Sequence, residues 1–326
     1  EKDILSHLDV NYEKAKKDNE FKTDIPLVLS DDEISAIKNK ISTKVSEDEL
    51  NKVVNDLTIV PEGFNIHPKL KKFIDTRKDY FKSDNPQIDW AFAEALAFGT
   101  LLNEGVSIRL SGQDSARGTF SQRHIVLTDV NSGSEINLHT NIKSDAKIEA
   151  LDSSLSENAV LGFEFGFSTA DPTTLVMWEA QFGDFANGAQ VIIDNFIASS
   201  YTKWGLPSDI VLLLPHGQEG QGPEHSSARL ERFLELCAGD NMFVCNPTTS
   251  AQYFHLLRRQ AKDKVRKPLI IMTPKSLLRE KLAASPKFDF VNEKFHRVLF
   301  DNLDKSKVRK VLLCSEIGRA SCRERV

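Results

Sequence analysis

From residue 89 onward, short apolar runs alternate with helix-like runs, and no other feature constrains the fold as strongly. Strands whose residues are all apolar are buried on both faces, because crossover helices cover a parallel sheet from both sides. The sequence therefore predicts an α/β fold with a doubly wound, mostly parallel sheet and helices on both faces, and it leaves the strand order open. The expected strands are Val106–Leu110, Thr174–Met177, Ile210–Leu214, Met242–Cys245 and Leu269–Met272, and the expected helices between the last four are Ala186–Ala198, Ser226–Ala238 and Thr249–Lys262.

The chain before residue 88 is polar and rich in lysine. Ser30–Glu33 and Ser46–Glu49 both fit the capping box, in which a Ser hydroxyl and a Glu carboxylate satisfy amides at a helix start. Apolar residues follow at helical spacing, so each helix has one face that needs a partner surface. Residues 1–87 are therefore expected to form a helical connecting segment that packs on a larger domain, with Lys71–Lys82 as a solvated helix face.

That larger domain is expected at residues 88–274. Asp89 is placed to cap a helix over Trp90–Glu104, which is apolar on most sides and so should be buried, and Gly105 should end it. Residues 275–315 look like the start of a truncated C-terminal domain, with strands expected at Val298–Phe300 and Val311–Cys314.

The last segment, residues 316–326, has no apolar period and matches one reading frame of a common short-read sequencing adapter. We interpret it as adapter read-through and leave it out of fold and function arguments, with a genuine basic tail as the alternative. The chain starts with Glu1 and not with Met, so we expect it to begin within a longer protein.

Composition excludes several classes of function. With 42 basic and 47 acidic residues the net charge is −5, which gives no broad electrostatic case for binding nucleic acid or an anionic membrane. No apolar run approaches the roughly 20 residues of a spanning helix, so a soluble protein is expected. The four cysteines lack the spacing of a zinc site and are expected to be reduced thiols: Cys237, Cys245, Cys314 and Cys322.

Four motifs point to one family. Leu155–Glu157, Trp178–Phe185, Leu214–Arg229 and Arg109–His124 resemble the thiamine-diphosphate-dependent decarboxylating component of 2-oxoglutarate dehydrogenase. The likeness runs from about residue 89 to residue 279 and covers the transketolase-like pyrimidine-binding domain of that family. It therefore implies that the chain is a fragment, and that Gln181–Gly188 lies at the carboxyl end of a strand, where α/β sheets bind ligands.

Glu157 has two interpretations. Ser154–Glu157 is itself a capping box, which would make Glu157 a helix-start residue. The resemblance implies instead that Glu157 is catalytic and hydrogen-bonds a ring nitrogen of the aminopyrimidine of the cofactor. Phe182 and Phe185 flank Asp184, and both are cofactor-binding candidates, since one of them could stack on the pyrimidine. Aromatic residues near a strand end are commonly core, but the motif match indicates Phe185 as the stacking residue.

A glycine-rich segment, His216–His225, connects an expected strand to an expected helix. Its glycines fit neither a Walker loop nor a dinucleotide fingerprint. The resemblance implies that His225 is the catalytic, substrate-binding histidine and that Ser226 caps the next helix, with His216 as the weaker candidate. Asp114 and Arg117 follow the first strand and are kept as cofactor-cleft candidates, although such charged clusters are commonly structural.

The function implied is that of a 2-oxoglutarate dehydrogenase, which decarboxylates 2-oxoglutarate on thiamine diphosphate and passes the succinyl group to a lipoyl carrier. Magnesium ligands, the second half of the cofactor site and substrate-binding histidines are expected outside this chain, in an upstream domain. The expected partners are a second copy in a homodimer, the lipoyl-bearing succinyltransferase and a small 2-oxo acid, in the cytoplasm or, in a eukaryote, the mitochondrial matrix.

Two alternative functions stay open, and a third is disfavoured. The related 2-oxoadipate dehydrogenase is not separated by these residues, and neither is a noncatalytic scaffold domain. A serine hydrolase is disfavoured, because the sequence has no Gly-x-Ser-x-Gly elbow and adjacent residues such as His225 and Ser226 seldom face one another.

Overall fold

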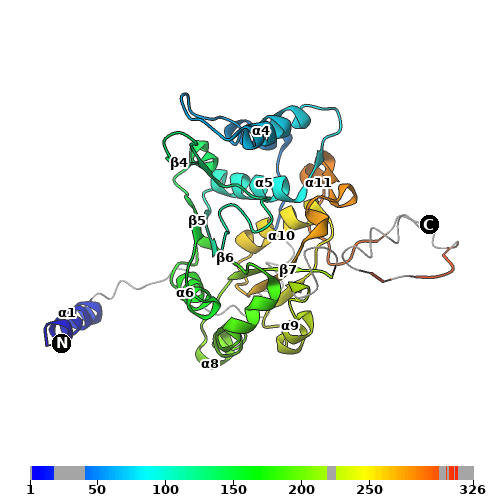
Figure 1. The fold of residues 1–326 in the computed structure, drawn as a ribbon. Helices are drawn as coiled ribbons and strands as arrows, with labels where there is room; N and C mark the ends of the chain where they lie inside the picture. Colours follow the sequence, from blue (N-terminus) through cyan, green and yellow to red (C-terminus); the bar gives the residue numbers. More distant parts are fainter. Residues whose placement is uncertain are drawn as a thin grey trace.

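A six-stranded parallel sheet forms the centre of the computed structural model, which describes residues 2–17, 41–218, 225–300, 306, 308–311 and 313–314. Every pair of neighbouring strands is parallel, so the predicted α/β fold with a mostly parallel sheet is confirmed (Figure 1). In spatial order the strands are β5 (Ile148–Asp152), β2 (Ser107–Gly112), β6 (Thr174–Glu179), β7 (Val211–His216), β9 (Leu269–Pro274) and β8 (Phe243–Cys245).

Alternate residues of the central strands β6, β7 and β9 enter two separate cores. Leu175 and Met177 of β6 face one side of the sheet, while Val176 and Trp178 face the other. This two-sided burial explains why the strands are continuous apolar runs. Helices α3 (Glu47–Asp56), α5 (Trp90–Asn103) and α10 (Ser250–Lys262) cover the first side, and α6 (Glu157–Ala170), the π-helical η3 (Ile193–Ile197) and α9 (Leu230–Leu236) cover the second.

Two predicted helix caps are present. The Glu49 amide donates to Ser46 Oγ over 3.1 Å at the start of α3, and the Phe92 amide donates to Asp89 Oδ1 over 2.7 Å at the start of α5. Helix α4 (Pro68–Phe81) is charged as expected, but it buries Ile74, so only part of its surface is solvated. The capping box at residues 30–33 lies outside the described residues.

Besides the expected helix Ser226–Ala238, which begins only at Leu230, three predicted elements differ from the structure. Ala186–Ala198 is not one α-helix: a 3-10 segment, η2 (Gly183–Ala189), leads through α7 (Gln190–Ile192) into η3. No strand forms at Val298–Phe300, where Phe300 is 86 % exposed, because an isolated strand has no ladder to satisfy its amides. Residues 311, 313 and 314 are not in a strand either, and residue 312 lies outside the described residues.

Two short ladders accompany the sheet. β1 (Gln87–Ile88) pairs antiparallel with β10 (Ser285–Pro286), so the chain leaving the sheet returns to the segment that enters it. β3 (Val126–Thr128) and β4 (Glu135–Asn137) form a hairpin. The remaining elements are α1 (Lys2–Lys17), η1 (Leu138–Asn141), α8 (Ser200–Trp204), η5 (Ser276–Leu278), η6 (Lys281–Ala283) and α11 (Lys287–Asn292).

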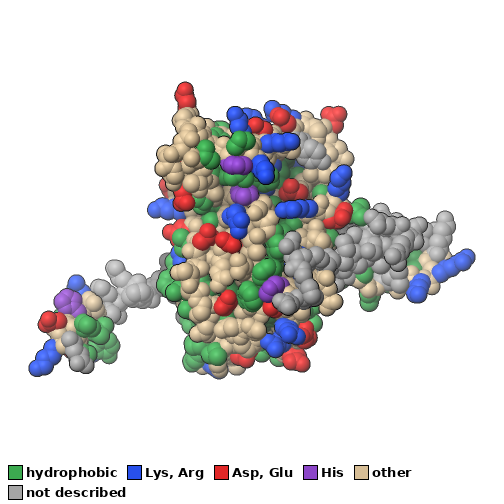
Figure 2. All heavy atoms as spheres, viewed as in Figure 1, with side chains coloured by type: hydrophobic (Ala, Val, Ile, Leu, Met, Phe, Trp, Pro, Cys, Tyr) green, Lys and Arg blue, Asp and Glu red, His purple; other side chains and the backbone are tan. Residues whose placement is uncertain are grey.

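The distribution of surface charge and the state of the cysteines bear on the expectations drawn from composition. Acidic and basic side chains are interspersed over the face shown in Figure 2. Within the described residues, no helix is both long and apolar enough to cross a bilayer. Cys237 and Cys245 are free thiols, burial raises the pKa of Cys245 to about 11, and Cys322 lies outside the described residues.

A buried histidine ties the chain before the sheet to the chain after it. His255 of α10 is 0 % exposed; its Nδ1 lies 2.9 Å from Thr43 Oγ1 and its Nε2 lies 2.9 Å from the carbonyl oxygen of Asp289. Since the carbonyl can only accept, Nε2 carries the proton and Nδ1 accepts from the Thr43 hydroxyl. Burial lowers the pKa of His255 from 6.5 to about 4, so this side chain is neutral at pH 7.

We therefore expect His255 to make the protein acid-sensitive. The unfolded chain takes up the proton at a higher pH than the folded chain, so the unfolding free energy should fall as the pH drops from about 6.5 to about 4, by roughly 3 kcal/mol for this group. Urea denaturation of the chain and of His255→Gln across this range should show a shallower pH dependence in the variant. An unchanged dependence would contradict the assignment; the exposed His67→Gln is the control.

Candidate active site

The predicted site residues gather at one edge of the sheet, beyond the carboxyl ends of the parallel strands. Gln113 directly follows β2, Gln181 follows β6, His216 is the last residue of β7, and Lys275 follows β9. Parallel strands end at the same edge, so these loops meet there. This edge is where α/β sheets bind ligands.

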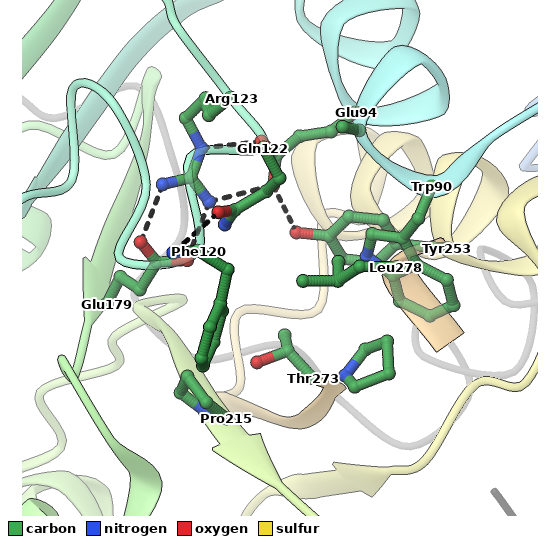
Figure 3. A pocket seen from close by; sticks show the side chains of 12 residues that line it. Trp90, Glu94, Phe120, Gln122, Arg123, Glu179, Pro215, Tyr253, Thr273 and Leu278 are labelled. Atoms are coloured by element: carbon green, nitrogen blue, oxygen red, sulfur yellow. Dashed lines mark hydrogen bonds and ion pairs between the residues drawn. The ribbon is translucent and has the colours of Figure 1, made fainter. Parts of the chain in front are cut away.

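A buried network of ion pairs lies at this edge of the sheet (Figure 3). The Arg123 guanidinium lies between two carboxylates: it donates to both oxygens of Glu94 over 2.6 and 3.1 Å and to both oxygens of Glu179 over 2.6 Å. The Tyr253 hydroxyl donates to Glu94 over 2.7 Å. Burial raises the pKa of Glu179 and raises that of Tyr253 well above its ordinary value. The network joins α5, the loop after β2, β6 and α10.

Sequence reasoning missed most of this network. It placed Arg123 in a charged cluster after the first strand but did not select Glu94, Glu179 or Tyr253, because the partners lie 29, 56 and 159 residues apart along the chain. One signal was present. Glu94 is an acid inside a helix that is otherwise apolar on most sides, and a buried carboxylate requires a partner.

We expect Arg123→Met to be among the most destabilising single substitutions in the chain. It leaves two carboxylates buried without their cation, which costs about 3–5 kcal/mol. Urea denaturation should also show that adding Glu179→Gln to Arg123→Met recovers part of the loss, since one buried charge is then removed. Arg117→Met is the control, since that side chain is 50 % exposed and its ion pair is worth at most about 1 kcal/mol. Similar losses for both arginines would contradict this account.

His225 lies against two phenylalanine rings. Its ring stacks on Phe182 with 4.3 Å between centroids and meets the edge of Phe185 at 5.4 Å. Its Nδ1 is buried without a hydrogen-bond partner and lies 3.8 Å from Asp184 Oδ2, beyond hydrogen-bonding distance. The structure thus brings together three predicted site residues and adds Asp184, to which the sequence assigned no role.

Local backbone geometry creates this contact. A Cβ atom on Gly183 would lie 2.4 Å from the Ala228 Cβ and 2.5 Å from the Pro215 carbonyl oxygen, so only glycine lets η2 approach the chain after β7 this closely. That approach brings Phe182 and Phe185, on either side of Gly183, against His225.

The predicted Ser-capped helix directly after His225 is absent. α9 begins only at Leu230, and its N-cap residue Arg229 has a left-handed backbone with φ of 57°. Side chains satisfy the preceding amides instead: Ala228 donates to His216 Nδ1 over 2.9 Å, and Arg229 donates to Ser227 Oγ over 3.1 Å. His216 therefore shapes the segment that carries His225.

Glu157 is the first residue of α6. The capping box predicted from Ser154 would place it in the third position of the helix, and that arrangement is wrong: the N-cap is Ser156, without a side-chain cap bond. Gln113 Nε2 donates to Glu157 Oε1 over 3.3 Å. A Cβ atom on Gly188 would lie 3.3 Å from Glu157 Oε2, so glycine there leaves room beside this oxygen of the carboxylate.

Asp114 and Arg117 pair with each other over 3.1 Å and are both about half exposed. Gln181 Nε2 also donates to Asp114 Oδ2 over 3.3 Å, which links the loop after β2 to the loop after β6. These contacts hold the two loops together at this edge of the sheet. Contact of Asp114 and Arg117 with a ligand stays a prediction. Among the described residues, no group of three or more His, Cys, Asp or Glu side chains is arranged to hold a metal ion.

Comparison with known proteins gives the family. Residues 86–281 match the family described as "Transketolase, pyrimidine binding domain". The chain belongs to this family. The match spans the parallel sheet and the edge that carries Glu157, Phe185 and His225, and it is consistent with a thiamine-diphosphate-dependent domain.

The chain is also similar to relatives named "2-oxoglutarate dehydrogenase E1 component". One from Cupriavidus necator is 51 % identical over 280 residues, covering 84 % of this chain and 29 % of the relative. One from Rickettsia felis is 55 % identical over 288 residues, covering 86 % and 29 %, and one from Brucella abortus is 54 % identical over 286 residues, covering 84 % and 28 %. The predicted resemblance is confirmed. The chain spans less than a third of the length of these relatives.

Proposed function

We propose that this domain supplies the pyrimidine half of the thiamine-diphosphate site in a 2-oxoglutarate dehydrogenase, which transfers the succinyl group to a lipoyl carrier. The observation that carries the proposal is the arrangement at one sheet edge: an accessible carboxylate at the start of α6, packed beside the segment η2 that bears the aromatic rings and His225. The names of the relatives favour 2-oxoglutarate as the substrate.

The residues present fit an aminopyrimidine. Glu157 would hydrogen-bond a ring nitrogen, and Phe185 would stack on the ring. When bound, thiamine diphosphate supplies a nucleophilic carbon and an electron sink for the decarboxylation of a 2-oxo acid. Glu157 would hold and release a proton at the ring nitrogen, and His225 would exchange a proton on the substrate side. Magnesium and the diphosphate would be held by residues outside this chain.

A homodimer would complete the site. The surface next to Glu157 exposes apolar side chains on α6 and its neighbours: Leu155 is 53 % exposed, Phe163 is 59 % exposed and Val191 is 61 % exposed. Exposed apolar residues on the segments around the proposed cofactor carboxylate favour a protein interface. We infer that a second copy covers this face and brings the other half of the cofactor site, while the lipoyl-bearing succinyltransferase receives the acyl group.

Glu157→Gln in the full-length enzyme tests the cofactor assignment. The amide keeps the shape but cannot act as an acid, so proton exchange at the thiazolium carbon of the bound cofactor should slow by about 10²–10⁴-fold while the fold persists. Exchange is measured by deuterium incorporation followed by NMR. Normal exchange in Glu157→Gln would reject the role, and the exposed Glu135→Gln should behave like the parent enzyme.

His225→Ala in the full-length enzyme tests the substrate side. Cofactor binding should persist, since the histidine is assigned to the other face of the site, while turnover should fall by about 10²–10⁴-fold, the usual contribution of one acid–base group. Acylation of the lipoyl domain is the measurement, with the exposed His67→Ala as control. Near-normal lipoyl acylation in His225→Ala would remove this residue from the site and make His216 the next candidate.

A further inference from the structure

The two carboxylate oxygens of Glu157 lie in different surroundings. Oε1 accepts a hydrogen bond from Gln113 Nε2 over 3.3 Å, and among the described residues Gln113 is the one that donates to this carboxylate. On the other side, a Cβ atom on Gly188 would lie 3.3 Å from Oε2, so glycine leaves room there. The side chain as a whole is half-buried. The chain thus holds one oxygen and leaves space beside the other.

The backbone on either side of this hydrogen bond is fixed. The amide of Ser153 donates to the carbonyl oxygen of Gly112 over 2.8 Å, and the amide of Ala116 donates to Asp152 Oδ1 over 2.8 Å. These two bonds tie the loop that carries Gln113 to the end of β5, from which the chain continues into α6. The donor and the helix start that bears the acceptor are therefore held next to each other by the fold.

Close packing at the end of β2 sets the position of Gln113. A Cβ atom on Gly112 would lie 2.1 Å from the carbonyl oxygen of Glu179, and Gly112 has a φ of 151°. Glycine is the residue that tolerates both the contact and this backbone conformation. The strand can therefore end directly against β6, and Gln113 follows at the sheet edge where the proposed site lies.

The hydrogen bond makes the two oxygens unequal as places for a proton. A carboxyl group that exchanges a proton with a ring nitrogen does so through one oxygen. A proton on Oε1 would compete with the N–H of Gln113 for that oxygen, whereas a proton on Oε2 meets no such donor. The same hydrogen bond restricts rotation of the carboxylate about its last carbon–carbon bond. Oε2 is therefore the oxygen suited to carry the proton.

We propose that Gln113 is a positioning residue, which holds Oε1 of Glu157 so that Oε2 carries the proton and meets the ring nitrogen of the aminopyrimidine. The proposal rests on the proposed function, because it requires Glu157 to face that nitrogen. Gln113 acts through Glu157. It lies within the family motif Arg109–His124, but the motif alone assigned it no role.

The test compares how tightly the full-length enzyme binds thiamine diphosphate and an analogue in which C–H replaces the ring nitrogen that Glu157 would meet. Calorimetric titration with magnesium and without substrate gives both dissociation constants, so the readout does not depend on turnover. The parent enzyme should bind the cofactor about 10–100-fold more tightly than the analogue, because the analogue cannot pair with the acid. Glu157→Ala should bring this ratio of affinities to about 1.

Two variants of Gln113 carry the test. Gln113→Met keeps an unbranched side chain of similar length but has no N–H donor. We expect it to lower the ratio of affinities by about 3–10-fold, because a carboxyl group that can rotate and take its proton on either oxygen loses part of its bond to the ring nitrogen. Gln113→Asn keeps an amide but withdraws it by one methylene, so it should lower the ratio as well. Circular dichroism verifies folding, and Gln113→Asn carries the test if Gln113→Met does not fold.

A matched control removes a similar hydrogen bond. Gln190 Nε2 donates to Asp194 Oδ1 over 2.7 Å, an amide–carboxylate pair that does not include Glu157. Gln190→Met should keep the parent ratio of affinities. A fall in Gln190→Met equal to that in Gln113→Met would overturn the assignment to Gln113.

The ratio separates failure of this proposal from failure of the proposed function. If Gln113 served the fold alone, its loss would weaken binding of both ligands by the same factor. A ratio unchanged in the folded Gln113 variants, but near 1 in Glu157→Ala, would overturn the role of Gln113 and leave the proposed function intact. A ratio near 1 in the parent enzyme would reject the contact between Glu157 and the ring nitrogen, and this proposal with it.

Discussion

The buried pairing of Arg123 with Glu94 and Glu179 is the interaction on which the rest of this edge depends. Each partner comes from a different element, so the network fixes where α5, the loop after β2 and β6 lie relative to one another. Such pairs add little net stability, because removing the charges from water costs about as much as their attraction returns. Their effect is on geometry, since any other arrangement would leave a buried charge unpaired. The loop that follows β2 is therefore held in one position.

Direct contacts connect that loop to the proposed catalytic groups. The same loop carries Gln113, which donates to Glu157, and Asp114, which accepts from Gln181 at the start of the segment that bears the aromatic rings. Phe120, from the same loop, meets the edge of Phe182 with 6.0 Å between ring centroids, and Phe182 in turn stacks on His225. The ion network is thus connected to both sides of the site through direct contacts.

The sequence could predict what depends on local periodicity. The five expected apolar strands of the sheet and the cap at Asp89 are written in consecutive residues, and the structure agrees with them. The family motifs are equally local, and the family match confirms the resemblance. β5 was missed because it is an edge strand in which exposed and half-buried residues alternate, so it lacks the continuous apolar run of the central strands. The late start of α9 was missed because the amide of Ala228 is satisfied by the ring of His216, 12 residues away. The network around Arg123 was missed for the same reason, since a tertiary partner leaves no local pattern.

The side of the site around Arg123 and the side around Glu157 differ in how completely the chain itself surrounds them. Around Arg123 the polar groups are buried and paired within the chain, so that side is formed before any ligand arrives. Around Glu157 the helix start is half-buried, Gln113 contacts one carboxylate oxygen while Gly188 leaves room beside the other, and the apolar residues Leu155 and Phe163 of the same segment are exposed. The proposed contact of Glu157 with a ring nitrogen requires a dry surrounding, which the described residues provide on one side only. Under the proposed function the remaining cover would come from another surface, and the exposed face of α6 is where that surface would bind.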